Sequence, residues 1–400
     1  HVTEDVFAVQ TRILEHNRRI LNDPDFGSVP SLPDEGRDTH RIFTPELAQP
    51  PQMWSTHPQS HLREENAKKR YIHADLDSRS AWEVFENPIV LRKELTNHLF
   101  SDIKEARKRT EETLQEVDRT YHKEFYNPSY RGAYLGRSVV ASVQKATELY
   151  LPQGAVTETE LYPESLTDEI EKERGLRKEK ALLTALRDRT FESPDGKIRF
   201  RGEIIKRSKL GEAIETVTED LNRCEIDLQL HDQKCRTYHY RVAYHFSEGW
   251  AKYHEALLRA LHYADHSQRN ILDANRKLNN TYSVVIADGN VSQNELQRLI
   301  GDANVVYLAV KQIYGDRRNF IPDDQLRQRL GGKPWQERWE EFRLPAPNPN
   351  NIGDWLNGFS GWLGEADDNL EAMRTGALEQ LLKTEADLAA HYRNGTTPAP

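Results

Sequence analysis

Histidines gather between residues 239 and 266, in two successive predicted helices, and two of them have the spacing of a metal-binding pair. The gathered residues are His239, His245, His254, His262 and His266. His262 and His266 are four residues apart, which places both imidazoles on one face of a helix. Asp265 or Glu255 lies close enough along the chain to supply a third ligand. The alternative is that these histidines form the polar shoulder of a packed helix, because His254 lies about 80° from His262 around the helix axis. We expect no metal in this chain, and His262 and His266 are the candidates if one binds.

Two further features speak against zinc-protease and cysteine chemistry in the chain itself. His254 and Glu255 begin like the zinc motif HExxH, but Leu258 stands where the second histidine is required. The two cysteines, Cys224 and Cys235, are eleven residues apart in one predicted helix. They are then about 16 Å apart along the helix axis, too far for a disulfide bond, which favours a reducing compartment.

Residues 288–295 match the second half of a calcium-binding loop. The first half does not match, because Val284 and Ile286 stand where the first two carboxylates are required. A structural explanation accounts for the same residues. Asp288 and the following glycine predict a turn, and Ser292 with Glu295 predicts a capping box that opens the next helix.

The third candidate site lies in the loop sequence Ser-Thr-His-Pro at residues 55–58. His57 is held by the proline that follows it, and Arg63 comes six residues later. Such a pair can present one titratable donor and one cationic donor to the same cleft, where they would orient a carbonyl or stabilise an oxyanion. The alternative is that His57 only caps the helix that follows.

The composition restricts the class of protein to which these residues belong. The chain has 400 residues, with 64 acidic and 55 basic side chains and a net charge of −9. This acidity, with the basic residues scattered among the acidic ones, argues against nucleic acid as a partner. No run approaches the ~18 apolar residues of a membrane helix. Aromatic residues make up 9%, too many for a disordered acidic chain.

Apolar residues recur at helical spacing over most of the chain. The long helical patterns cover residues 3–22, 166–190, 202–246, 250–283, 292–314 and 354–392. Residues 23–63 are rich in proline and lack this period, and residues 63–127 resume it with interruptions. A turn and a short extended piece separate the patterns that end near residue 190 and begin near residue 202. We predict a mainly α fold, in which a Pro-rich, loop-containing helical N-terminal part is followed by a bundle of long antiparallel helices.

The sequence changes near residue 155 from an irregular, proline-rich pattern to long helical patterns, and a proline-rich linker lies near residue 343. These two changes predict three parts. These are residues 1–155, a long-helix module over 156–342, and a linker, terminal helix and disordered tail over 343–400.

The segment around His57 resembles a known family. Ser-Thr-His-Pro with arginine six residues after the histidine is similar to the S-T-H-P-x-x-x-x-R segment of the zinc metallopeptidases related to HtpX and the CAAX prenyl endopeptidases. The match is most specific over residues 53–87, where the sequence continues through Ser80-Ala-Trp-Glu-Val-Phe as in larger bacterial members with a long helical C-terminal extension. In that family the histidine and arginine line the active-site cleft, so the resemblance assigns this role to His57 and Arg63.

The resemblance also implies where the rest of the machinery lies. The HExxH pair and the third zinc ligand of the family are not in this chain, so we expect them, together with the membrane helices, upstream of His1. Residues 1–155 would then be the C-terminal part of a metallopeptidase-like domain, forming a cleft wall without the zinc motif. The implied activity is peptide-bond hydrolysis by a zinc-bound water, with zinc held in the parent protein and this chain inactive alone.

The implied partners are a protein or peptide substrate and the upstream catalytic and membrane segment. A further copy of the chain, in a homo-oligomer, is an additional candidate partner. The implied location is at a membrane through the upstream segment, with this part in the cytoplasm. The rival hypothesis from another class is a non-catalytic helical scaffold or protein-interaction module, which long helices with charged faces also favour. A third hypothesis is a metal-dependent helical domain that uses His262 and His266.

Overall fold

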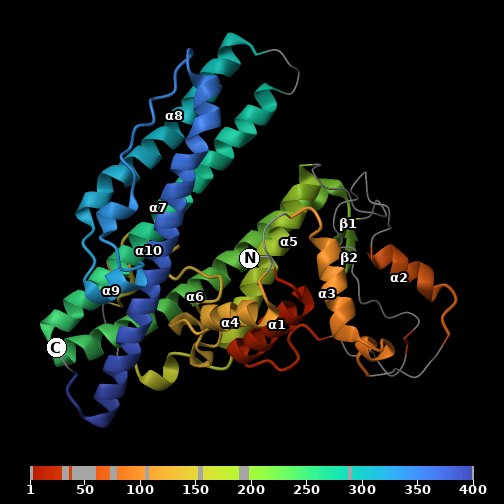
Figure 1. Ribbon diagram of the computed structural model, residues 1–400, viewed down its shortest axis with the longest axis horizontal. Helices are drawn as coiled ribbons and strands as arrows, with labels where there is room; N and C mark the ends of the chain where they lie inside the picture. Colours follow the sequence, from red (N-terminus) through yellow and green to blue (C-terminus); the bar gives the residue numbers. More distant parts are fainter. Residues whose placement is uncertain are drawn as a thin grey trace. The chain divides into compact units, whose positions relative to one another are not determined.

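The computed structural model describes residues 3–28, 36–37, 60–72, 79–103, 108–151, 156–188, 198–286 and 291–398. Helices dominate these ranges, and two short strands form a hairpin (Figure 1). The predicted mainly α fold with long antiparallel helices is confirmed. The elements in chain order are α1 (Val6–Leu21), α2 (Ser60–Lys68), α3 (Pro88–Leu99), α4 (Thr110–Tyr121), α5 (Leu166–Arg187), β1 (Ile198–Phe200), β2 (Glu203–Ile205), α6 (Leu210–Phe246), α7 (Glu248–Val285), α8 (Gln293–Asp316), α9 (Asp324–Arg329) and α10 (Ile352–Asn394).

The contacts group the chain into two compact units, and neither unit is continuous in sequence. Unit 1 consists of residues 1–133 and 162–228, and unit 2 consists of residues 134–161 and 229–400. The helix α6 therefore contributes its first part to unit 1 and its second part to unit 2. The boundaries predicted near residues 155 and 342 stay predictions.

In unit 1, the helix α1 packs against α3 and α4. The helix begins at Asp5, whose carboxylate accepts a hydrogen bond from the backbone nitrogen of Ala8 at 3.0 Å, as an N-cap residue does. The same carboxylate is buried and pairs with Arg92 of α3 at 3.1 Å. Thr96 of α3, also buried, accepts a hydrogen bond from the backbone nitrogen of Val6 at 3.2 Å. The helix α3 is thus attached to α1 through polar groups.

The β-hairpin corrects the prediction of one helix over residues 202–246. Residues 203–205 form β2 instead, which pairs antiparallel with β1, and α6 begins only at Leu210. The chain reverses at Arg201 and Gly202, whose φ angles are +49° and +90°. Two successive residues with positive φ suit a tight hairpin turn and cannot belong to a right-handed helix.

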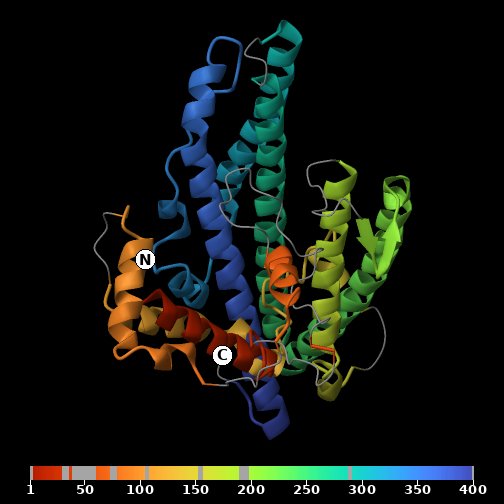
Figure 2. The same ribbon diagram turned by 90° about the vertical axis from the view of Figure 1, so that its right-hand side faces the viewer.

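In unit 2, the three long helices α7, α8 and α10 lie side by side, and both α8 and α10 pack against α7 (Figures 1 and 2). Ser292 and Glu295 form the predicted capping box at the start of α8. Residues 134–161, which we call the strap, join this unit although they precede its helices by about 70 residues. The strap contributes buried apolar side chains to the core, namely those of Val139, Val140, Val143, Ala146, Leu149 and Leu161.

Candidate functional site

A group of buried ionisable side chains in unit 2 surrounds Glu385 of α10. Its carboxylate Oε1 lies 2.7 Å from Nε2 of His254 on α7, and both side chains are almost completely buried. Because a carboxylate only accepts, Nε2 of His254 carries the proton and donates it to this bond. The other ring nitrogen, Nδ1, lies 3.1 Å from the hydroxyl of Tyr150 in the strap. The three side chains form a relay from a phenol through an imidazole to a carboxylate.

Charged and neutral groups of α6 complete this cluster. Arg236 lies 3.1 Å from Oε2 of Glu385, is 1% exposed, and donates a hydrogen bond to the hydroxyl of Tyr134 in the strap at 2.7 Å. His239 lies 4.0 Å from the same carboxylate oxygen. We call Glu385, Arg236, His239, His254 and Tyr150 the Glu385 cluster.

The electrostatics of the cluster fix its protonation states near neutral pH. Burial by itself would raise the pKa of Glu385, but the Arg236 charge and the two histidines outweigh it and hold that pKa at about 2. Burial lowers the pKa of His239 to about 4, so its ring is neutral at pH 7. Burial, with the Glu255 and Glu385 charges, raises the pKa of the Tyr150 phenol above its ordinary value. The cluster therefore holds the Arg236–Glu385 ion pair beside the neutral ring of His239 and the protonated phenol of Tyr150.

These protonation states limit what the cluster can do chemically. A hydroxyl, an imidazole and a carboxylate in this order resemble the arrangement that activates a nucleophile. Burial and the nearby carboxylates raise the pKa of Tyr150, so its phenol is protonated and donates a hydrogen bond to Nδ1 of His254, the ring nitrogen left as acceptor by the proton on Nε2. The ion pair with Arg236 stabilises Glu385 as a permanent anion. We interpret the cluster as a set of buried polar contacts that hold the strap against the helices α6, α7 and α10.

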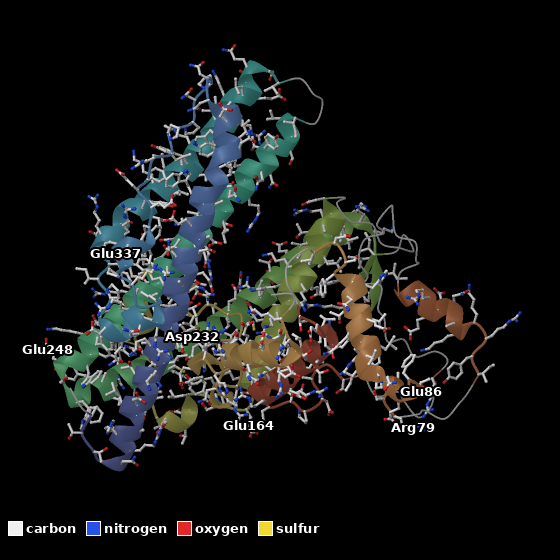
Figure 3. The ribbon with its side chains drawn as sticks, in the orientation of Figure 1. Arg79, Glu86, Glu164, Asp232, Glu248 and Glu337 are labelled. Atoms are coloured by element: carbon white, nitrogen blue, oxygen red, sulfur yellow. The ribbon has the colours of Figure 1, made fainter. Side chains whose placement is uncertain are left out.

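A second buried cluster attaches the two ends of the strap to α6. Arg137 donates to Asp232 at 2.7 Å, and Asp232 is labelled in Figure 3. His231 Nε2 lies 2.6 Å from the carbonyl oxygen of Leu161, and its Nδ1 lies 3.3 Å from Asp232. Both partners are acceptors, so both ring nitrogens are donors and His231 is an imidazolium. Burial opposes this charge, but the hydrogen bonds to Asp232 and Cys235 raise the pKa of His231 to about 10.

The predicted metal pair has a different role in the structure. His262 Nε2 lies 3.1 Å from the carbonyl oxygen of Val143, and His266 Nε2 lies 2.9 Å from that of Val140. The two rings stack with their centroids 4.1 Å apart. Both Nε2 atoms therefore donate to the strap, which favours the interpretation of a polar shoulder over a metal pair.

The third ligands considered for this metal pair are held in ion pairs. Asp265 pairs with Arg269 at 3.0 Å and Glu255 with Arg259 at 3.3 Å, each within α7. Within the described ranges, no group of three or more histidine, cysteine, aspartate or glutamate side chains is arranged to hold a metal ion.

The two residues assigned to a peptidase cleft by resemblance have separate outcomes. Arg63 lies in the first half of α2, and its side chain is exposed to solvent. His57 lies outside the described residues. Cys224 and Cys235 both lie in α6, as predicted, and both are buried free cysteines.

No local sequence pattern points to Glu385, Arg236 or Tyr150, and His254 and His239 stand out only as members of a histidine-rich stretch. The sequence does hold one weak signal, because Arg236, His239 and the spacing to His231 and Cys235 place polar groups on the buried side of a long helix. Glu385 lies 131 residues after His254, so no local pattern connects them.

Comparisons with known proteins identify no relative: no protein-family model matches the chain, and no similar protein was found among curated proteins or solved structures. Over the ranges that the structure describes, none of the helices combines the length and the apolar character needed to cross a membrane.

Proposed function

We propose that the chain is the C-terminal portion of a membrane-associated zinc metalloendopeptidase. The observation that carries the proposal is the Ser-Thr-His-Pro segment at residues 55–58 with Arg63 six residues after His57. In this proposal the zinc ion, its water and the glutamate base belong to the part of the polypeptide upstream of residue 1. His57 and Arg63 would line the cleft and stabilise the oxyanion of the transition state. The solvent-exposed position of Arg63 on α2 supports this role, because a cleft residue must reach the substrate.

An apolar surface that follows the motif in the sequence supports the same proposal. We call this surface the α3 patch, and its side chains, which lie in α3 or shortly before it, are 48–82% exposed. They are those of Val84, Phe85, Ile89, Val90 and Leu99. Arg92 and Thr96 attach α3 to α1, whereas Ile89, Val90 and Leu99 of the same helix remain more than half exposed. Exposed apolar patches mark interaction sites in soluble proteins. In our proposal the patch is covered by the catalytic part of the peptidase.

The test is substitution in the full-length parent protein. His57→Ala and Arg63→Ala should each lower the rate of peptide cleavage, by about 10²-fold if the side chain stabilises the oxyanion. Arg63→Lys should recover part of the rate, since it keeps the charge but loses the planar donor pair. Arg70→Ala is the matched control, because Arg70 is an exposed arginine just beyond α2.

Thermal unfolding separates a cleft role from a structural one. The variants of the exposed Arg63 and Arg70 should unfold within about 1–2 °C of the native protein, as surface substitutions do, and the cleft role predicts the same for His57→Ala. Normal cleavage by both alanine variants would show that the cleft role is wrong.

A second candidate function is a non-catalytic helical interaction module. It is favoured by a groove of about 880 Å³ in unit 2, along one face of α7. Its apolar lining comes from Ala256, Ala260, Phe320, Ile321 and Met373. A volume of this order is within the range of ligand pockets. A photo-crosslinking residue placed at position 321 should form a discrete adduct with a partner in cells. The additional substitution Ala260→Arg should abolish this adduct. An adduct pattern that Ala260→Arg leaves unchanged would argue against this function.

A further inference from the structure

A cavity of about 430 Å³ lies in unit 2, where the start of α7, the helix α9, the C-terminal part of α10 and the residues after α10 meet. Its volume is within the range of small-ligand sites. Trp250 lines the cavity from the first turn of α7, and Gln325 lines it from α9. Gln380, Thr384 and Asp387 line it from α10. The cavity therefore combines a large aromatic ring with amides, a hydroxyl group and a carboxylate.

The directions of the hydrogen bonds on the buried side of the cavity are fixed by Arg329. Its Nε only donates and lies 2.7 Å from Oε1 of Gln380, so the oxygen of this amide faces Arg329. Nε2 of Gln380 then donates to Oε1 of Gln325 at 2.7 Å and to Oγ1 of Thr384 at 3.4 Å. Gln380 is 2% exposed and Thr384 is 5% exposed, so these bonds form away from bulk water. Both acceptors keep their own hydrogens for other partners.

Two donors at the end of this network have no acceptor among the described residues. They are the hydroxyl of Thr384 and the Nε2 amide of Gln325. Threonines elsewhere in the helices donate to the backbone carbonyl oxygen four residues before them, and these are Thr11, Thr96, Thr113, Thr120, Thr216 and Thr218. The hydroxyl of Thr384 instead accepts from the Gln380 side chain. Because a buried polar group without a partner is costly, its hydrogen needs an acceptor from solvent or from a ligand.

The chemistry of the lining points to a neutral ligand that is rich in hydroxyl groups. Among the described residues of the lining, Asp387 is the one carboxylate, and no lysine or arginine is present. The charge of Asp387 is compensated by Lys383, which lies 3.3 Å from its Oδ2. A ligand here must accept from Thr384 and Gln325 and donate to Asp387, and hydroxyl groups do both. The indole of Trp250 suits the apolar face of a sugar ring.

We propose that this cavity binds a carbohydrate. One sugar ring lies against the indole of Trp250, and its hydroxyl groups accept from Thr384 and Gln325 and donate to Asp387. The proposal goes beyond the peptidase hypothesis and uses none of its residues, nor any residue of the groove along α7, so it is tested independently of both. The competing class of ligand is a flat aromatic ring such as a nucleobase, which also stacks on an indole but carries no hydroxyl groups.

The experiment is saturation-transfer difference NMR of the full 400-residue chain with the methyl glycosides of common hexoses, N-acetylhexosamines and pentoses, and with adenine as the probe for the competing class. At least one glycoside should receive saturation from the protein. The transfer should be strongest to the carbon-bound hydrogens of one ring face, because that face lies against Trp250. Transfer to adenine and to no glycoside would overturn the proposal, and so would transfer to none of the probes.

Substitutions place the bound glycoside in this cavity. Thr384→Val keeps the shape of the side chain and removes its hydroxyl, so it should weaken binding about three- to tenfold, the effect of one hydrogen bond. Thr384→Ser restores the hydroxyl and should recover most of the affinity. Trp250→Leu removes the aromatic ring and should weaken binding at least about fivefold.

Thr375→Val is the matched control for the threonine. Thr375 lies in the same helix, but it donates to Oε1 of Glu371 at 3.1 Å and does not line the cavity, so this variant should bind as the native chain does. Calorimetry on each variant checks that it is folded. Equal losses of affinity in the two valine variants would overturn the proposal, as would native affinity in both Thr384→Val and Trp250→Leu.

Discussion

Removal of the Glu385 carboxylate should destabilise unit 2 more than any surface change in the same helix. Glu385→Ala removes the carboxylate that pairs at 3.1 Å with the Arg236 guanidinium, which is 1% exposed. It also removes the acceptor that His254 reaches at 2.7 Å. Breaking a buried ion pair by deleting one partner costs about 3–5 kcal/mol. Because 1 kcal/mol corresponds to roughly 2–4 °C for a unit of this size, the melting temperature of unit 2 should fall by about 6–20 °C.

The assay is differential scanning calorimetry, supported by urea unfolding monitored by circular dichroism. Asp387→Ala is the matched control, because Asp387 lies two residues further along α10 and makes an exposed pair with Lys383 at 3.3 Å. An exposed pair contributes less than about 1 kcal/mol, so the control should unfold close to the native chain.

A double variant tests whether the cost comes from the uncompensated charge. Arg236→Met combined with Glu385→Leu removes both charges and keeps the volume filled, so it should be more stable than Glu385→Ala alone. A fall of less than about 3 °C for Glu385→Ala would refute this account of the cluster. The account would also be refuted if the double variant lost as much free energy of unfolding as Arg236→Met and Glu385→Leu, measured singly, lose in sum. Such additivity would mean that the two charges act independently.

Two further predictions concern charge and backbone. His231 has a pKa raised to about 10, above the ordinary value near 6.5, so its contribution to stability is complete below pH 6.5 and is lost as the pH rises through 10. Urea midpoints should therefore fall more steeply between pH 6.5 and 10 for the native chain than for His231→Gln, and parallel profiles would contradict the assignment. Gly301→Ala should raise the free energy of unfolding by about 0.5–1 kcal/mol, because this glycine lies inside α8 and a Cβ there meets nothing within 4 Å. Gly132→Ala should lower it, since the φ of +75° is strained for alanine and the new Cβ would lie 2.9 Å from Leu21, and calorimetry that shows the same sign for both would contradict this reasoning.

Local patterns in the sequence were sufficient to predict most of the extent of the long helices of this protein. The apolar period predicted the long helices because each of them buries one stripe, and a stripe repeats every 3.6 residues whatever the partner is. Helix starts were also readable where the capping residues are neighbours in sequence. Ser292 and Glu295 satisfy each other's backbone groups within four residues, so the start of α8 needs no tertiary information.

The prediction was wrong at residues 203–205, where local signals compete. Their side chains continue a helical pattern, but the pair Arg201 and Gly202 adopts positive φ angles and reverses the chain into a hairpin. Residues 203–205 form their backbone hydrogen bonds with β1, in place of the bonds that they would form within a helix. Whether a helix or a hairpin forms depends on residues on both sides of the turn, and the helical period of one segment contains no information about the other.

The partners of the polar side chains in unit 2 were decided by the tertiary structure alone. His262 and His266 have the spacing of a metal pair, and the same spacing equally suits two donors to the carbonyl oxygens of Val143 and Val140. Which of these occurs depends on what lies opposite the helix face, and the strap that lies there precedes α7 by about 100 residues of chain.

The sequence by itself determined that this chain is a hydrophilic, mainly α protein and where most of its long helices begin and end, because those features arise from interactions between residues a few positions apart. Only the tertiary structure decided that Glu385 and Arg236 are buried as an ion pair with His254 beside them. A charged residue on a helix is solvated by default, and it is buried only when the fold brings a partner from distant parts of the chain to compensate its loss of water.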